Sequence, residues 1–297
     1  MFFMVCRAGT IFLIFMGAVV GLLGCDQGST TPSGATATPR ISVLATVYPL
    51  ADMGRQIGGK LVDVQWLTEG AQRPEDIESS NELKVRANNA QLLITSGSWD
   101  GWALRELSAD ARNNRVVEPG HMEASRGAGP KAYLWLDPAV MREMAEATRM
   151  GLTLITPRHD GEFRENAKAF TEEVEKVDEA YRARLAGMRG RKVLAVRPVW
   201  GALCARYGLT LLAPVDVREE ELKAEDFKEL SRVAKAEGLH TIFIDVSTPA
   251  GVRQRIEERT GLKAMTLDAM GSSAADGRNT WAGIMRYDLE QLQAGLR

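Results

Sequence analysis

The chain has 297 residues, with 37 Lys and Arg against 39 Asp and Glu, for a formal net charge of -2. Both signs are mixed along the chain without a basic stripe, so we expect no nucleic-acid partner. Cys6 and Cys25 lie near the N-terminus, and Cys204 is the remaining cysteine. This distribution excludes an internal disulfide or a Cys-based zinc site after residue 25.

The N-terminal segment predicts an extracytoplasmic protein. An apolar segment follows Arg7 and ends in Leu22-Leu23-Gly24-Cys25, an order typical of a secretory signal. A stop-transfer helix would need roughly 20 apolar residues with polar flanks on both sides. Residues 22–25 resemble a bacterial lipobox, which implies cleavage before Cys25 and its acylation. We therefore predict a signal peptide at 1–24 and a lipid anchor in the bilayer of the cell membrane, on the periplasmic face if the cell has two membranes; an uncleaved anchor is the alternative.

Residues 25–40 predict a flexible tether. They are rich in Ser, Thr, Gly and Pro, and this composition offers few side chains that a core could bury. The remaining body, from Ile41 to Arg297, is long enough for two modest domains or one large one.

Strand and helix patterns alternate along the body. We predict strands at 41–50, 62–68, 91–97 and 115–119, with helices at 51–58 and 80–90. The alternation returns with strands at 192–198, 211–217, 241–247 and 264–270 and helices at 224–238 and 249–261. Gly238 and Gly261 stand where a helix commonly stops. The pattern predicts two doubly wound α/β domains, whose parallel sheets are covered on both faces.

A long amphipathic helix is predicted between these domains. Apolar residues recur at spacings of three and four, at Phe163, Ala167, Phe170, Val174, Val177, Tyr181, Leu185 and Met188. This stripe predicts a helix that begins near Asp160 and ends before Gly190. At 1.5 Å per residue it would be about 40 Å long, enough to reach both domains. We predict an N-terminal domain at 41–158, a linking helix at 159–189 and a C-terminal domain at 190–297; a helix packed on one domain is the alternative.

The segment from Ala132 to Pro138 reads AYLWLDP. Its apolar residues predict a buried strand, and Asp137-Pro138 predicts the cap and first turn of a helix. If the ring of Tyr133 is buried, its hydroxyl needs a polar partner.

Several segments, taken in order, resemble metal-binding substrate-binding lipoproteins of zinc and manganese ABC importers (cluster A-I). They are residues 45–71, 133–138, 205–209, 242–249 and 266–273, together with the long helix. The resemblance covers nearly the whole body. It implies two α/β domains joined by a rigid backbone helix, a ligand cleft between them, one divalent metal ion and an ABC permease as partner. It also implies a non-enzymatic protein, which we expect to be monomeric.

The resemblance places four residues at the family's ligand positions. Glu75 and Tyr133 stand where the family has its first two His ligands, and Arg197 stands where it has a His or Glu. Asp268 retains the fourth, acidic position. None of the chain's histidines, His121, His159 and His240, falls on a ligand position. Zinc binding through imidazoles is therefore not supported.

Arg197 separates three interpretations of this cleft. A guanidinium about 5 Å from a divalent ion would repel it by roughly 6–7 kcal/mol at an effective dielectric constant near 20, most of the roughly 8 kcal/mol of a micromolar affinity. In the first interpretation Arg197 turns away, and Glu75, Asp268 and Tyr133 hold manganese, iron or, less suitably, zinc.

In the second interpretation, Arg197 forms a bidentate pair with Glu75 or Asp268 in place of the metal, and the protein is an accessory or regulatory scaffold beside a transporter. In the third, Arg197 binds the carboxylate or phosphate of an anionic or chelated solute.

Three further residues are candidate neighbours of the cleft: Asp245, Trp99 and Trp200. Core packing is the more common use of a tryptophan such as Trp99, and Asp245 would otherwise cap a turn. Glu75, Asp268, Asp245 and Tyr133 could perform acid–base chemistry. However, no nucleophile–base pair, Gly-rich phosphate loop or Cys/His group appears at a strand end in the sequence, so we do not expect an enzyme.

Overall fold

The computed structural model describes residues 40–68, 72–78, 80–95, 116–117 and 133–297. The chain divides into two units, Met1–Ala37 and Thr38–Arg297, and every described residue lies in the second. The predicted signal peptide, Cys25, Trp99 and His121 lie outside the described residues. Within the described ranges, no helix is both long and apolar enough to cross a membrane.

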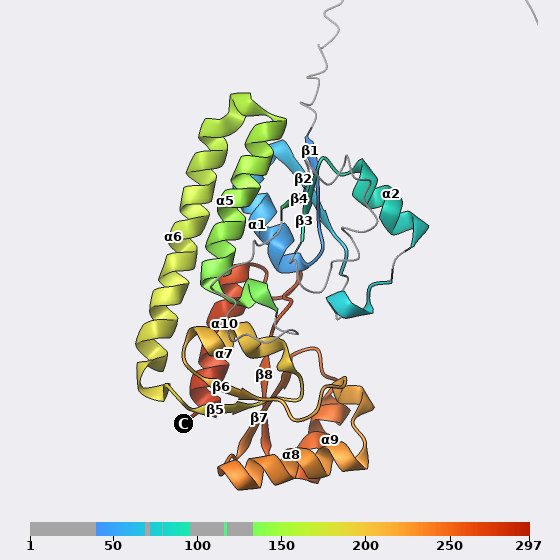
Figure 1. The fold of residues 1–297 in the computed structure, drawn as a ribbon, viewed down its shortest axis with the longest axis vertical. Helices are drawn as coiled ribbons and strands as arrows, with labels where there is room; N and C mark the ends of the chain where they lie inside the picture. Colours follow the sequence, from blue (N-terminus) through green and yellow to red (C-terminus); the bar gives the residue numbers. More distant parts are fainter. Residues whose placement is uncertain (1–39, 69–71, 79, 96–115, 118–132) are drawn as a thin grey trace, which may run out of the picture. The chain divides into compact units, whose positions relative to one another are not determined.

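The N-terminal half contains a parallel sheet whose described strands lie in the order β2-β1-β3-β4 (Figure 1). These strands are Ile41–Ala45 (β1), Val62–Trp66 (β2), Leu92–Ile94 (β3) and Val116–Val117 (β4). In the register, Val43 lies opposite both Val64 and Leu92. Each of the four strands lies inside a segment that the sequence predicted to be a strand, but the observed strand is shorter than the predicted one. The first predicted strand, 41–50, was too long, because the chain turns at Thr46 and Val47 and residues 48–50 belong to a helix.

Helices cover both faces of this sheet, which confirms the predicted doubly wound arrangement (Figure 1). They are Tyr48–Gly58 (α1), Asn81–Asn89 (α2) and Pro138–Ile155 (α5). Val43 and Leu92 pack in the core shared with α1 and α5. Leu44 and Leu93 point to the opposite face, where they pack near Ala87 of α2. The Ser80 hydroxyl accepts a hydrogen bond from the amide of Leu83 and thereby caps the N-terminus of α2.

The long helix α6 runs from Asp160 to Leu185 and has 26 residues. Every predicted apolar residue within it is buried: Phe163, Ala167, Phe170, Val174, Val177, Tyr181 and Leu185. The helix packs against α1 and α5 of the N-terminal half and against α10 of the C-terminal half. The helix therefore contacts both halves of the chain.

The C-terminal half contains two parallel strand pairs, β5–β6 and β7–β8, linked by a bridge between Ala195 and Phe243. The strands are Lys192–Leu194 (β5), Thr210–Leu212 (β6), Thr241–Asp245 (β7) and Lys263–Leu267 (β8). The helices are Gly201–Arg206 (α7), Ala224–Glu237 (α8), Ala250–Thr260 (α9) and Trp281–Gly295 (α10). Gly238 and Gly261 end α8 and α9 in the left-handed conformation, as predicted.

Alternate residues of these strands enter different cores. Leu194 and Ile242 pack with residues of α8 and α9. Val193 and Phe243 point the other way, into a cluster that contains residues of α6 and α10 and also Val43 of the N-terminal sheet. One continuous apolar cluster therefore joins the two halves.

The predicted strand at 132–138 is wrong for the residues that the structure describes. Leu134–Leu136 forms a 3₁₀ helix, and the backbone N–H of Tyr133 donates to the carbonyl of Val199 at 2.9 Å. The apolar pattern correctly indicated burial, because Trp135 and Leu136 are buried, but burial alone does not determine the backbone period. Asp137 caps α5 as predicted, since its carboxylate accepts from the amide of Ala139 at 2.8 Å.

Candidate functional site

Three of the four residues placed by family position meet at one point between the halves. Glu75 lies in a 3₁₀ helix, Pro74–Asp76, after β2. Tyr133 precedes the 3₁₀ helix Leu134–Leu136, and Arg197 precedes another, Pro198–Trp200, after β5. Prolines begin two of these turns, where a fixed φ is suited to helix entry and no backbone N–H is needed.

Arg197 forms an ion pair with Glu75. The hydroxyl of Tyr133 donates to Oε2 of the same carboxylate at 2.7 Å, and Nη2 of Arg197 donates to the Tyr133 hydroxyl at 3.5 Å. Arg197 is 7% exposed and Tyr133 is 1% exposed. The guanidinium is therefore directed into the site and contacts both other residues.

Burial shifts the proton affinity of these groups in opposite directions. It raises the pKa of Tyr133, and the charge of Asp245 adds to the rise. Burial and the nearby charge of Arg73 lower the pKa of Arg197. The phenol therefore remains a neutral hydrogen-bond donor, because burial favours the uncharged form of an acid.

Arg73, which the sequence analysis missed, forms a second ion pair across the site. It is 5% exposed, and its Nη2 donates to Oε2 of Glu219 at 2.7 Å. The other Glu219 oxygen accepts from the backbone N–H of Asp245 at 3.4 Å. Burial acts to lower the pKa of Arg73, but the charges of Glu219 and Asp245 outweigh it and raise the pKa. Arg73 is thus held as a cation by the C-terminal half.

Asp245 serves mainly to shape a turn. Its Oδ1 accepts from the backbone N–H and the hydroxyl of Ser247, at 2.8 and 2.5 Å. Burial raises the pKa of this carboxyl. The structure therefore supports the turn-capping role that the sequence suggested for Asp245, next to Glu219.

Asp268, the fourth family position, is engaged elsewhere. Its Oδ1 accepts from the backbone N–H groups of Met270 and Gly271, at 2.9 and 2.7 Å, and its Oδ2 accepts from Arg278 at 2.7 Å. Gly271 has a φ of 58°, which permits this tight turn. Both Asp268 oxygens thus have partners outside the group formed by Glu75, Tyr133 and Arg197.

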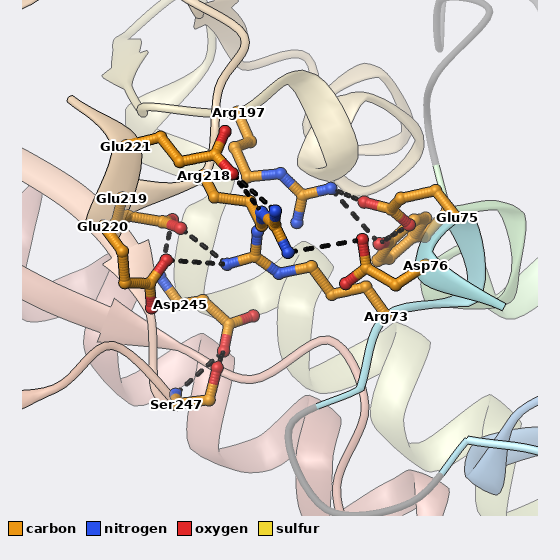
Figure 2. Close-up of polar contacts among 11 residues, drawn as sticks. Arg73, Glu75, Asp76, Arg197, Arg218, Glu219, Glu220, Glu221, Asp245 and Ser247 are labelled. Carbon is orange, nitrogen blue, oxygen red and sulfur yellow. Dashed lines mark hydrogen bonds and ion pairs between the residues drawn. The ribbon is translucent and has the colours of Figure 1, made fainter. Parts of the chain in front are cut away.

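Figure 2 shows the wider charged cluster, which we define as Arg73, Glu75, Asp76, Arg197, Arg218, Glu219, Glu220, Glu221 and Asp245. Arg218 binds Glu221 at 2.7 Å and lies 3.7 Å from Asp76. Carboxyl groups outnumber guanidinium groups in the cluster, yet guanidinium groups lie between them (Figure 2). Among the described residues, no group of three or more His, Cys, Asp and Glu side chains could hold a metal ion.

The other candidates fall outside this cluster. Trp200 is 2% exposed and belongs to the continuous apolar cluster. His159, partly buried beside α6, lies 3.9 Å from Glu162, and His240 precedes β7. The sequence carried one signal for the missed residue: Arg73 stands two positions before Glu75, in the same loop.

Comparison with known proteins identifies the family of the chain. The model of the family described as zinc-uptake complex component A, periplasmic (ZnuA) matches residues 43–295. The zinc-binding protein AdcA of Streptococcus pyogenes serotype M6 is 19% identical over 86% of this chain and 56% of its own length. The chain thus spans about half the length of the first curated relatives it matches. The manganese ABC transporter substrate-binding lipoprotein PsaA of Streptococcus mitis is 21% identical over 98% of this chain and 99% of its own length.

Solved structures confirm the fold class. The Zn(II)-bound ZnuA-like domain of Streptococcus pneumoniae AdcA matches with a TM-score of 0.76 at 19% identity, over 86% of this chain and 99% of that one. The periplasmic zinc-binding protein TroA of Treponema pallidum matches with a TM-score of 0.71 at 18% identity, over 86% and 99% of the two chains. These neighbours share the two-domain α/β architecture.

Proposed function

The chain belongs to the zinc-uptake complex component A family, and we propose that it is an importer-associated lipoprotein in which an Arg197–Glu75 ion pair replaces the metal. In this proposal it is a monomer, anchored outside the cytoplasm through acylated Cys25, that acts beside a membrane permease as an accessory or regulatory component. It is neither the zinc carrier of that permease nor an enzyme. The contact between Arg197 and Glu75 is the observation that carries the proposal.

The contacts of Glu75 leave little capacity for a metal. One carboxylate oxygen pairs with Arg197, and the other accepts from Tyr133. A metal ligand at Tyr133 would have to be a phenolate, yet burial raises the pKa of this phenol. The buried Arg197 would also repel a divalent ion by roughly 6–7 kcal/mol at about 5 Å.

The two other interpretations of the cleft fit the contacts less well. A hard cation at Glu75, Tyr133 and Asp268 needs Arg197 turned away and needs Asp268 free, whereas Asp268 binds Arg278 and two backbone N–H groups. An anionic solute at Arg197 would meet a cluster in which carboxyl groups outnumber guanidinium groups. Ion pairs within the chain therefore account best for this cluster.

Metal titration tests the proposal. Elemental analysis of the purified full chain should find no stoichiometric zinc, manganese or iron. Calorimetric titration of the metal-free chain with each ion should show no binding tighter than about 10 μM, equivalent to about 7 kcal/mol. Nanomolar binding of zinc or manganese would overturn the proposal and favour a metal carrier.

A designed variant tests whether the three positions form a converted metal site. The triple substitution Glu75→His, Tyr133→His and Arg197→His places three imidazoles where the present side chains already meet. We expect it to bind zinc at least 100-fold more tightly than the wild type, a difference of about 2.7 kcal/mol. The matched control, Glu75→Gln with Arg197→Met, removes the ion pair without adding ligands and should gain no such affinity.

A further inference from the structure

A pocket of about 530 Å³ lies at the carboxyl ends of the N-terminal strands, apart from the charged cluster. It is lined by Tyr48, Gln65, Trp66, Thr68, Arg86, Met270, Gly271, Ser272, Ser273 and Ala274. No residue of the charged cluster is among these lining residues. The turn formed by Met270, Gly271 and Ser272 separates it from a smaller cavity of about 240 Å³ that Arg73 and Asp245 line. The larger pocket is thus a distinct cavity with walls from both halves.

The aromatic wall of this pocket is held in place before any ligand arrives. The rings of Tyr48 and Trp66 pack edge to face, with centroids 5.3 Å apart. The guanidinium carbon of Arg55 lies 5.0 Å from each of these centroids. The Tyr48 hydroxyl donates to the carbonyl of Asn279 at 2.9 Å, which ties the wall to the C-terminal half. A fixed wall of this kind lowers the ordering cost of binding a flat apolar group.

Arg86 gives the pocket its charge. Among the lining residues that the structure describes, it is the one with a formal charge. Its Nη2 donates to the carbonyl of Trp66 at 3.0 Å, which orients the group and leaves other guanidinium N–H groups for a ligand. The pocket therefore favours an anionic group, and a planar carboxylate matches the geometry of guanidinium donors.

Thr68 supplies a second, independent indication of a ligand. The residue is 3% exposed, and its hydroxyl oxygen has no hydrogen-bond partner among the described residues. Such a buried, unpaired hydroxyl is costly to a folded protein unless something else satisfies it. The hydroxyl oxygen itself is enclosed, but Thr68 lines the pocket, so a change of side-chain rotamer would bring this hydroxyl to a polar atom of a bound molecule.

We propose that this pocket binds a small planar organic acid. Its ring would lie against Tyr48 and Trp66, its carboxylate would pair with Arg86, and a polar atom would bond to the Thr68 hydroxyl. The volume lies in the range of roughly 300–1,000 Å³ that is typical of small-molecule sites. This inference goes beyond the proposed function and does not depend on the metal titration.

Titration with defined probes tests the proposal. Benzoate and indole-3-carboxylate are added to the full chain by calorimetry at low ionic strength, with benzamide and indole-3-carboxamide as neutral counterparts. We expect at least one acid to bind with a Kd below about 1 mM and at least tenfold more tightly than its amide. Absence of saturable binding by both acids up to about 10 mM, or equal binding of acids and amides, overturns the proposal.

A pair of threonine variants locates the site. Thr68→Val keeps the side-chain shape and removes the unpaired hydroxyl, so we expect unchanged or higher thermal stability and about fivefold to tenfold weaker binding of the acid. Thr148→Val is the matched control, because Thr148 is also buried with an unpaired hydroxyl but lies in α5 outside the pocket. It should change stability in the same direction and leave binding unaltered. Equal affinity in both variants would contradict the assignment.

Discussion

Two regions join the halves of this protein, and they use different physical interactions. In the continuous apolar cluster, Nε1 of Trp135 donates to the carbonyl of Ala269, and Nε1 of Trp281 donates to the carbonyl of Trp135, each at 2.7 Å. In the charged cluster, Arg197 pairs with Glu75 and Arg73 pairs with Glu219. The apolar cluster and these two ion pairs are largely buried, but the first region is apolar with a few satisfied polar atoms and the second consists of charges.

The difference shows which interactions stabilise the fold and which side chains can be replaced while the fold is kept. Burying apolar side chains stabilises the folded state directly. Burying an ion pair first costs the hydration of both ions, so the net gain is small even when the geometry is good. The apolar cluster therefore maintains the two-domain arrangement, while substitutions in the charged cluster are expected to leave the fold unchanged.

The largest expected effect is in the apolar cluster. Trp281 is fully buried, and Trp281→Ala should lower the free energy of unfolding by about 3–5 kcal/mol, because it leaves a cavity between the halves. Urea denaturation followed by circular dichroism measures this loss. Trp281→Phe, which keeps most of the packing and removes the hydrogen bond to Trp135, should lose about 1–2 kcal/mol. A loss below about 1 kcal/mol for Trp281→Ala would contradict the view that the apolar cluster stabilises the fold more than the charged cluster does.

The charged cluster should show strong coupling between its partners. Arg197→Met leaves Glu75 without its countercharge and should destabilise the fold by about 2–3 kcal/mol. Adding Glu75→Gln to the same chain should restore most of that loss, because neither charge then remains. Denaturant unfolding of the two single variants and the double variant completes a thermodynamic cycle. Additive losses in the double variant would show that the two side chains do not act as a pair.

Asp288 carries a buried carboxyl outside the charged cluster, and we expect this group to make the stability of the fold depend on pH. It is fully buried in α10 and one of its oxygens has no partner, and burial raises its pKa well above the ordinary value. Its contribution to stability is therefore fully present below the unfolded pKa of about 3.9 and is lost as the pH rises through the higher folded pKa.

Asp288→Asn should consequently be more stable than the wild type at pH 8, by about 2–4 °C in Tm. The advantage should shrink as the pH falls toward the unfolded pKa of about 3.9, below which the wild-type carboxyl is protonated in both states. Thermal scans of the two proteins across this range measure the difference. The same Tm difference at every pH would show that ionisation of Asp288 is not its cause.

The smallest effect is expected at an exposed ion pair. Arg232 and Glu229 lie on the solvent side of α8 and interact at 2.7 Å, a distance like that between Arg73 and Glu219. Arg232→Ala should leave Tm unchanged within error, because solvent screens exposed pairs. Thermal unfolding at low and high salt provides the measurement. A loss as large as that of Arg197→Met would mean that burial does not distinguish the two kinds of pair.

Much of the fold was predictable because apolar residues recur in the sequence with the periods of helices and strands. The stripe from Phe163 to Leu185 predicted α6 almost to its ends, and glycines predicted where α8 and α9 stop. The 3₁₀ turn at Leu134–Leu136 was not predictable, because its apolar residues pack between the halves and no strand among the described residues pairs with them. The final helix, α10, was not anticipated from its pattern.

The grouping of three candidate residues could be predicted from the sequence, but most contacts around them could not. Family position placed Glu75, Tyr133 and Arg197 together, and the structure brings these three into contact. The pair of Arg73 and Glu219 could not be foreseen, because 146 positions separate the partners and charged residues in loops are usually solvated. Asp268 was assigned to the same site, but local turn geometry holds it with Arg278 instead.

The ion pair between Arg197 and Glu75 also limits how this sequence can change over generations. Replacing either residue first leaves the other as an uncompensated charge in a poorly hydrated site. A lineage that exchanged this pair for imidazole side chains would have to pass through such an intermediate, whereas the fold itself would need no alteration. The two positions are thus expected to be inherited together, and such an exchange requires at least two substitutions close in time.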